Sequence, residues 1–240
     1  MDPLPTGAAK RAAVRDMFDA IAPRYDLVNR VMTGGLDQRW RRRTLDALAL
    51  PSGSRLVDLG SGTGDLVRLA RRAGHRVVGV DLSWEMLARG RARGAPVAVQ
   101  ADAELLPIAD GSVDGVVSGF ALRNLRDLAA ALAEVARVLR PGGRVALLEV
   151  AEPEPGPLRL GFGLWFDHVV PRIGGLLSDR DAYRYLPRSV AYLPDEAGLR
   201  RLLQQSGFST VGRRLLHGGL SQVITATRTG LPADATGRGR

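Results

Sequence analysis

Apolar residues follow two different rhythms along this chain. Between residues 10 and 49 they recur every three to four positions, as Val14, Met17, Phe18 and Ile21 do, which predicts helices. From residue 55 to residue 150, short apolar runs alternate with helical patterns. Helices are expected over residues 10–22, near 25–32, and over 36–49, 64–73, 83–92 and 127–139, and strands over 55–59, 76–80, 96–100, 113–118 and 144–150.

The C-terminal part adds a helix over residues 195–206 and two strand-like runs over 208–216 and 221–228. These runs predict a closing antiparallel hairpin. The whole pattern predicts an α/β fold, a doubly wound, seven-stranded, mostly parallel sheet with ligands at the carboxyl ends of its strands. Residues 10–228 are expected to form one domain, with a helical cap over 10–50 and an insertion over 151–190. Residues 1–9 and 229–240 lack periodicity and are expected to be disordered.

The stretch from residue 55 to residue 66 joins an apolar strand to a helix through three glycines. Gly60, Gly62 and Gly64 let the backbone turn sharply and approach a ligand where a Cβ would collide. Asp58 stands just before the turn, and Asp81 ends the next strand, where an α/β unit places an acid against a ribose diol. The loop is therefore expected to hold a nucleoside-type ligand; a packing loop in another α/β protein is the alternative.

The glycine spacing and the nearby acids narrow the ligand. Dinucleotide sites typically use G-x-G-x-x-G, whereas this loop reads G-x-G-x-G, with Asp58 before it and Asp65 directly after it. Acids so close would repel a pyrophosphate, but they suit a ligand with an ammonium and a sulfonium group. S-adenosylmethionine carries both, and the loop resembles the cofactor motif of class I methyltransferases.

Composition favours one compact enzyme domain without disulfides or metal. The 240 residues are 45% hydrophobic and include no cysteine, and the three histidines have no ligand-like spacing. The chain has no signal-peptide pattern and no apolar run near the roughly 18 residues of a membrane span. A cytoplasmic protein is therefore expected.

The formal net charge of +9 comes almost entirely from arginine, because Lys10 is the only lysine. The densest group, four arginines at positions 39 and 41–43, surrounds Trp40 on an expected helix. A solvated face is the simplest interpretation, and contact with anionic lipid is an alternative. Nucleic acid is not an expected partner, since no stacking aromatic residues interleave the arginines.

Two later strand ends offer further candidate residues. Asp102 and Ala103 close the third strand, where a carboxylate can accept from an adenine amino group and a small residue leaves room for the ring. A turn aspartate is the alternative. Residues 119–124 follow the fourth strand, and Arg123 and Asn124 there would sit opposite a methyl donor or simply cap the next helix.

Read together with the flanks, these pieces resemble the menaquinone and ubiquinone biosynthesis C-methyltransferases. Residues 17–26, with Asn29 and Trp40–Arg41, are similar to that family's N-terminal signature. The blocks at residues 102–107, 120–124, 140–143 and 183–189 are similar to its later ones, and the resemblance runs from about residue 14 to residue 216. It implies methyl transfer from S-adenosylmethionine to a ring carbon of a polyprenylated hydroquinone, demethylmenaquinol if the host makes menaquinone.

The resemblance also assigns cofactor positions. It implies that Thr63, Asp81, Asp102 and Ala103 contact S-adenosylmethionine. The family's serine before the phenylalanine of the Arg-Asn block is Gly119 here, although it remains a candidate cofactor position. The family's later Gly-Ile-Val-Ala-Leu-His block reads Gly-Leu-Ser-Gln-Val-Ile at residues 219–224, which would suit a paralogue with a different quinol or phenol.

The expected chemistry asks the protein to activate a ring carbon. Phenols titrate near 10, so the site must favour the phenolate. Arg123 can stabilise that oxyanion by a charge-assisted hydrogen bond. It is a poor direct base, because a guanidinium has a pKa above about 12 and keeps its proton. Arg123 and Asn124 are expected to orient the ring oxygen and a water. Tyr25 and Asp26 are further catalytic candidates for closing the site, with helix–helix packing as the alternative.

An isoprenoid tail needs an apolar cover. Residues 158–177 supply one in the insertion after the fifth strand, with a core helix or a homodimer interface as alternatives. Its apolar side chains are Leu164, Trp165, Phe166, Val169, Ile173 and Leu176. A lipid substrate would bring the enzyme to the membrane surface transiently. Three functions stay open: a quinol C-methyltransferase, a methyltransferase for another small phenol or secondary metabolite, and a non-catalytic nucleoside-binding module.

Overall fold

The computed structural model describes residues 6–95, 97–151, 153, 155–165, 169, 172, 185 and 188–230. The prediction of disorder for residues 1–5 and 231–240 concerns residues outside the described part of the chain. Most of the insertion also lies outside the described residues, including Phe166, Ile173 and Leu176.

A single twisted sheet organises the described part of the chain. Its strand order is β3-β2-β1-β4-β5-β7-β6, and all neighbours are parallel except β7, which runs antiparallel to β5 and β6. The predicted seven-stranded, mostly parallel sheet with a closing hairpin is therefore confirmed. The strands are β1 (Arg55–Leu59), β2 (Arg76–Asp81), β3 (Ala98–Gln100), β4 (Val113–Gly119), β5 (Leu139–Val150), β6 (Phe208–Leu216) and β7 (Ser221–Arg228).

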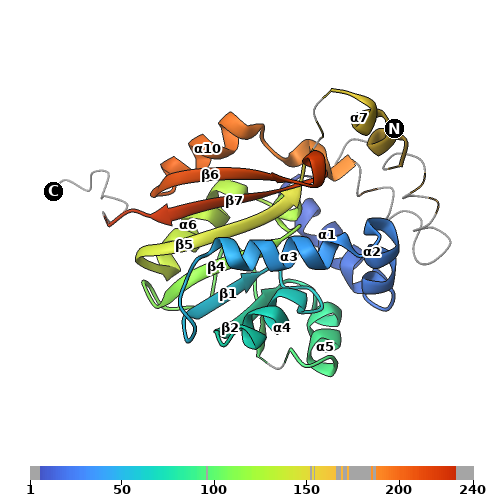
Figure 1. Cartoon of the computed structure of the whole chain (residues 1–240). Helices are drawn as coiled ribbons and strands as arrows, with labels where there is room; N and C mark the ends of the chain where they lie inside the picture. Colours follow the sequence, from blue (N-terminus) through green and yellow to red (C-terminus); the bar gives the residue numbers. More distant parts are fainter. Residues whose placement is uncertain are drawn as a thin grey trace.

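Helices cover both faces of this sheet. Figure 1 shows α3 in front of the sheet, α6 behind it, and α1 and α2 at one end of it. The helices are α1 (Gly7–Ile21), α2 (Tyr25–Thr33), α3 (Leu36–Ala47), α4 (Asp65–Arg72), α5 (Trp84–Ala92), α6 (Leu128–Val138), α7 (Pro157–Leu164) and α10 (Glu196–Gln205), with short 3₁₀ helices at Leu122–Asn124, Val190–Tyr192 and His217–Gly219. In the part of the chain that the structure describes, no helix is both long and apolar enough to cross a bilayer.

Strand residues divide the core between the two faces. Leu56 and Val117 pack with Leu45 and Leu66 on the face covered by α3 and α4. Val57, Leu59 and Val116 pack with residues of α6 and α10 on the other face. Because successive strand residues point to opposite faces, Asp58 and Gly119 face α3 and α4, as Leu56 and Val117 do. This division brings buried strand ends under the N-terminal helices.

Three predicted boundaries need correction. Helix α1 begins at Gly7, so residues 7–9 are helical and not part of a disordered terminus. Helix α6 ends at Val138, and β5 begins at Leu139 rather than at residue 144. Leu139 pairs with Val113 before the Pro-Gly-Gly segment, and the register then shifts, so the segment bulges inside a strand instead of separating two elements.

The strand order reverses between β1 and β4, which lie side by side in the middle of the sheet. Connections leave these two strands toward opposite sides, so their carboxyl ends open a crevice. The glycine loop follows β1, and the 3₁₀ helix Leu122–Asn124 follows β4. The sequence-predicted residues therefore meet at this reversal point.

Candidate functional site

A cavity of about 750 Å³, counting its open mouth, lies at the carboxyl ends of β1, β2 and β4. Helix α1 contributes Arg11 and Phe18 to its wall. The lining includes eight sequence-predicted site residues: Tyr25, Gly60, Gly62, Asp81, Asp102, Ala103, Gly119 and Asn124.

Five other predicted residues do not line this cavity. They are Asp26, Asp58, Thr63, Gly64 and Arg123. All five lie within two residues of lining residues, and four of them, Asp26, Thr63, Gly64 and Arg123, support the wall from behind through the contacts described below.

The glycine loop is shaped by close packing and by one carboxylate. Gly60 has φ +66°, and a Cβ there would lie 2.5 Å from the Cβ of Ala121, so no larger residue fits. The N–H of Gly62 donates to Oδ2 of Asp81 at 2.7 Å, and the N–H of Ser83 donates to Oδ1 at 2.9 Å. Burial raises the pKa of Asp81, although these two donors oppose the rise. The acid predicted to meet a ribose thus also ties the loop to β2.

Thr63 and Asp26 join the loop to helix α2. The Thr63 hydroxyl donates to Asp26 at 2.6 Å, and Arg93 forms an ion pair with the same carboxylate. Gly64 packs under the loop, where a Cβ would lie 2.4 Å from that of Ala95. Asp26 therefore holds the loop in place and does not face the cavity, unlike its neighbour Tyr25, which packs edge-on against Phe18 at 6.0 Å.

Asp102 is bound at the far end of the cavity. Its Oδ2 accepts from Nε of Arg11 at 2.5 Å, and its Oδ1 accepts from the N–H of Glu104 at 3.1 Å. The ion pair with Arg11 draws α1 over the cavity. Ala103 follows it in the wall, so the arrangement of an acid beside a small residue is present as predicted.

Arg123 is buried behind the cavity in a pair that the sequence analysis did not foresee. The guanidinium forms an ion pair with Glu149 at the end of β5, and its Nε donates to Ser189 Oγ at 3.0 Å. Its central carbon lies 6.0 Å from the centroid of the Phe120 ring, which does line the cavity. The charge available to an oxyanion is therefore shared with Glu149, whose Oε2 is buried and finds no hydrogen-bond partner among the described residues.

Asn124 presents an open acceptor. Its Nδ2 donates to the Phe120 carbonyl oxygen at 3.2 Å, while its Oδ1 is buried and has no hydrogen-bond partner among the residues that the structure describes. An unpaired buried carbonyl oxygen is costly, which makes Oδ1 a candidate to accept a ligand hydroxyl.

Asp58 is the most unusual acid at the site. It is 1% exposed, and among the described residues neither of its oxygens has a partner at full hydrogen-bond geometry, although the backbone of Val67 lies close enough to lower its pKa. Burial raises its pKa to about 8, although the positive charge of Arg41 opposes the rise. A buried carboxyl without partners is well suited to receive a cationic ligand group.

The residues that sequence reasoning missed act through long-range contacts. Glu149 pairs with Arg123 from 26 positions away, and Arg41 reaches Asp65 from another helix. In the described part of the chain, the buried hydroxyl of Tyr185 has no hydrogen-bond partner, and burial raises its pKa to about 12. Tyr185 lies in the block at residues 183–189 that is similar to the family, but its residue type and spacing indicate no role at the site. The acid at the end of the fifth strand could have been found by the strand-end reasoning applied to the other strands.

Ser118 does not replace the serine that is absent at position 119. Its hydroxyl is fully buried and donates to the carbonyl oxygen of Leu59 at 2.7 Å, which joins β4 to β1. The candidate cofactor contact at Gly119 must therefore be made by backbone or by a neighbouring side chain.

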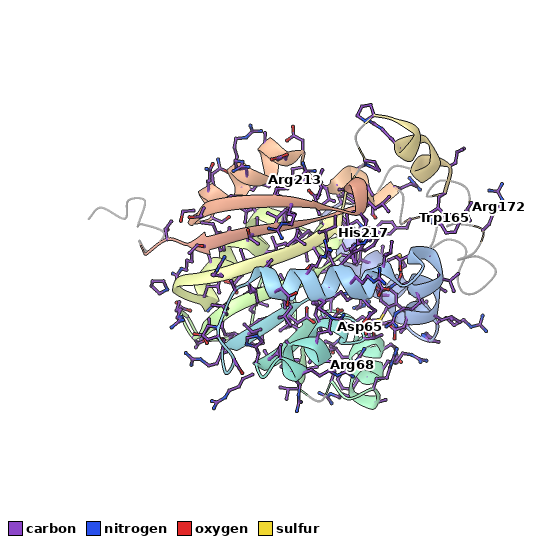
Figure 2. All side chains as sticks on the ribbon, in the orientation of Figure 1. Asp65, Arg68, Trp165, Arg172, Arg213 and His217 are labelled. Atoms are coloured by element: carbon purple, nitrogen blue, oxygen red, sulfur yellow. The ribbon has the colours of Figure 1, made fainter. Side chains whose placement is uncertain are left out.

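The expected apolar cover is described only in part. Helix α7 ends at Leu164, which is 62% exposed, and Trp165 lies beside α2, where its Nε1 donates to the Met32 carbonyl oxygen at 3.2 Å (Figure 2). Whether these side chains cover a substrate is not tested by the described residues.

The lining chemistry fits S-adenosylmethionine. Asp81, Gly62, Asp102 and Ala103, four of the predicted cofactor residues, line this one cavity. Asp58 is buried next to the lining residue Leu59. The individual contacts of these residues with the cofactor stay a prediction. Among the described residues, no group of three or more histidine, aspartate or glutamate side chains could hold a metal.

Comparison with known proteins gives the same cofactor class. The chain matches the ubiE/COQ5 methyltransferase family over residues 6–228. It is 43% identical over 220 residues to the demethylmenaquinone methyltransferase of Thermus thermophilus, covering 88% of this chain and all of that protein. It is 42% identical over 228 residues to the ubiquinone/menaquinone biosynthesis C-methyltransferase UbiE of Syntrophotalea carbinolica, covering 92% and 95% of the two chains.

Solved structures share the fold at low identity. A phosphoethanolamine N-methyltransferase of Haemonchus contortus with bound S-adenosylhomocysteine has a TM-score of 0.65 at 16% identity, covering 90% of this chain and 60% of that one. An S-adenosylmethionine-dependent methyltransferase of Thermotoga maritima has a TM-score of 0.63 at 21% identity, covering 90% and 100%. These likenesses show a class I methyltransferase fold.

Proposed function

Because this chain belongs to the ubiE/COQ5 methyltransferase family, we propose that it methylates a ring carbon of demethylmenaquinol. It is an S-adenosylmethionine-dependent methyltransferase of quinone biosynthesis. The relatives named demethylmenaquinone methyltransferase favour this acceptor. The structural observation that carries the proposal is the cavity at the reversal point, where the predicted cofactor residues meet Asn124 with its unpaired acceptor.

Bound S-adenosylmethionine supplies a methyl group already activated by its positive sulfur. The protein then has to hold the hydroquinone ring, keep water away and favour loss of a hydroxyl proton. Holding two reactants in a fixed orientation removes much of the entropic barrier. Tyr25, Phe120 and the α1 residue Phe18 provide aromatic walls for the ring.

Asn124 and Arg123 have different roles toward the ring oxygen. Oδ1 of Asn124 can accept the hydrogen bond of the neutral hydroxyl, which orients the ring. The guanidinium of Arg123 favours the phenolate electrostatically, from its position behind Phe120. Glu149 and Ser189 hold that guanidinium in one orientation, so they are positioning residues.

A transient membrane contact is part of this proposal. Exposed apolar residues gather on α2 and α7: Leu27, Val31, Leu164 and Trp165. Arg30, Arg89 and Arg93 line an adjacent surface depression with Leu27. Apolar side chains next to arginines suit the surface of an anionic bilayer, from which a polyprenylated acceptor would be taken.

The test is a transfer assay with labelled S-adenosylmethionine and a short-chain demethylmenaquinone, with and without a chemical reductant. We expect label in the extracted quinone only when the acceptor is reduced, because the oxidised ring has no hydroxyl to lose. A protein that binds S-adenosylmethionine but labels a simple phenol instead of the reduced naphthoquinol would contradict the acceptor and favour the second function class.

A further inference from the structure

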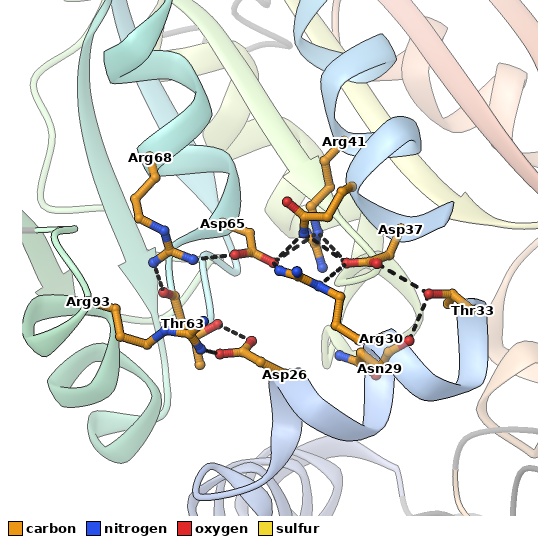
Figure 3. Close-up of polar contacts among 11 residues, drawn as sticks. Asp26, Asn29, Arg30, Thr33, Asp37, Arg41, Thr63, Asp65, Arg68 and Arg93 are labelled. Carbon is orange, nitrogen blue, oxygen red and sulfur yellow. Dashed lines mark hydrogen bonds and ion pairs between the residues drawn. The ribbon is translucent and has the colours of Figure 1, made fainter. Parts of the chain in front are cut away.

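A cluster of charged side chains joins helices α2, α3 and α4 (Figure 3). Asp65 accepts from Gln38 at 2.8 Å and forms ion pairs with Arg30, Arg41 and Arg68. Asp37 forms ion pairs with Arg30 and Arg41. Burial acts to raise the pKa of Asp65, but Arg41 and Arg68 outweigh it and lower the pKa. Three guanidinium groups thus face two carboxylates, which leaves one positive charge in excess.

The excess charge is best assigned to Arg41. Its Nε lies 3.7 Å from Asp65 and 3.9 Å from Asp37, which is longer than a hydrogen bond. That Nε is buried and has no hydrogen-bond partner among the described residues. Arg68 has the close contact with Asp65 and also donates to the Thr63 carbonyl oxygen at 2.7 Å. Arg41 is therefore the buried cation whose bonding is least complete.

Arg41 reaches the cavity wall through Gly119. A Cβ at Gly119 would lie 2.7 Å from NH1 of Arg41, so the guanidinium packs directly against the bare backbone of a residue that lines the cavity. Gly119 and Asp58 both face α3, and burial raises the pKa of Asp58 while the nearby charge of Arg41 opposes that rise. A buried guanidinium and a buried carboxyl therefore lie close together behind the part of the cavity wall that Gly119 forms.

We propose that Arg41 binds the carboxylate of the methionine part of S-adenosylmethionine, and that Gly119 makes this contact possible by having no side chain. The amino-acid end of the cofactor is a zwitterion, and its two charges match the pair of Arg41 and Asp58. The resembling family has a serine at position 119, whereas the glycine here leaves the space that a side chain would fill next to the Arg41 guanidinium. The inference rests on the proposed function for its cofactor but not for its acceptor.

The test is calorimetric binding of two ligands, S-adenosylmethionine and its decarboxylated form, which keeps the ammonium and sulfonium groups. Wild-type protein should bind the decarboxylated form about 10- to 100-fold more weakly, the value of a charge-assisted contact. Arg41→Gln should weaken S-adenosylmethionine binding by a similar factor and leave the decarboxylated form unchanged. Arg42→Gln, an exposed neighbour on the same helix, should change neither affinity.

Two further variants keep the test decisive if Arg41→Gln does not fold. Gly119→Ala should push the guanidinium away and weaken S-adenosylmethionine binding selectively, without removing any charge. Arg41→Lys should retain part of the selectivity. Equal losses for both ligands in the variants, or equal affinities for both ligands in wild-type protein, would overturn the proposal. Because no acceptor is present, these outcomes do not depend on which quinol or phenol is methylated.

Discussion

A single residue, Asp58, can couple the binding of the cofactor to the release of a proton. Its carboxyl is buried and, among the described residues, has no partner at full hydrogen-bond geometry; burial raises its pKa to about 8, with the charge of Arg41 and the backbone of Val67 opposing the rise. Near neutral pH the free protein therefore holds this group mainly in its protonated form. A cofactor ammonium beside it would favour the carboxylate.

The raised pKa of Asp58 predicts a fall in stability between about pH 4 and about pH 8. In this window the unfolded chain has lost the proton that the folded chain keeps, so the free energy of unfolding decreases as pH rises. Asp58→Asn should lack this decrease. Urea denaturation of the cofactor-free proteins at several pH values measures it, and parallel pH profiles for the two proteins would contradict the assignment.

The same group predicts proton release when S-adenosylmethionine binds near pH 6.5. Calorimetric enthalpies should depend on the ionisation enthalpy of the buffer for wild-type protein and much less for Asp58→Asn. A wild-type enthalpy that does not change with the buffer would mean that Asp58 does not meet the ammonium.

The buried ion pair of Arg123 and Glu149 leads to a second prediction, which concerns the free energy of unfolding. Removing one partner of a buried ion pair leaves an uncompensated charge, which typically costs about 3–5 kcal/mol. Glu149→Gln and Arg123→Gln should each lower the free energy of unfolding strongly. The double variant should lose much less than the sum, because neither charge remains.

Kinetic measurements test whether Arg123 also acts in catalysis or serves only to stabilise the fold. Arg123→Gln should lower kcat for methyl transfer while leaving S-adenosylmethionine affinity unchanged, since the cofactor residues lie elsewhere in the cavity. Additive stability losses would show that the pair is not coupled, and an unchanged kcat would remove Arg123 from the proposed mechanism.

At the element scale, the turn from β1 into α4 fixes the cavity wall. Gly60 needs both a left-handed backbone and the space that Ala121 leaves. Gly94 has a similar backbone, with φ +87°, but a Cβ there would meet open space. The two glycines therefore separate backbone strain from steric collision.

We expect Gly94→Ala to cost about 1 kcal/mol of stability through strain alone. Gly60→Ala should cost more and should also abolish S-adenosylmethionine binding, because the loop must move away from Ala121. Chemical denaturation and calorimetry on both variants measure this difference. Equal stability losses with cofactor binding retained in both would contradict the role of the loop contact.

Most elements could be predicted from local patterns, and the contacts between them could not. The strands over 208–216 and 221–228 matched their predicted ends, because apolar alternation and turn residues are local signals. The start of β5 was missed because Leu139 pairs with Val113 across a bulge. The placement of Asp26 away from the cavity depends on Arg93, which lies on the chain after α5, and no spacing rule signals such a pair.

At the scale of the whole molecule, charge and exposed apolar surface point to the same face. The net charge of +9 favours anionic surfaces in general. The exposed apolar residues of α2 and α7, beside Arg30, Arg89 and Arg93, give this attraction a direction. The arginine group at 39 and 41–43 contributes less than the sequence suggested, because Arg41 is buried in the charged cluster.

We predict binding to vesicles that contain anionic lipid, and weaker binding at higher salt. The double variant Leu27→Ser, Val31→Ser should bind these vesicles more weakly. Val97→Ser with Val99→Ser, a matched exposed pair at the edge of the sheet, should not. Co-sedimentation measures all three proteins, and equal binding by both variants would contradict a membrane face on α2.

The most direct measurement of the central claim is the position of the transferred methyl group. Protein supplied with ¹³C-methyl-labelled S-adenosylmethionine and a reduced short-chain demethylmenaquinone yields a product whose carbon NMR spectrum identifies the atom that carries the label. The proposed function predicts a methyl group on the ring carbon. A methyl group on oxygen, or no labelled product from protein shown to bind the cofactor, would contradict it.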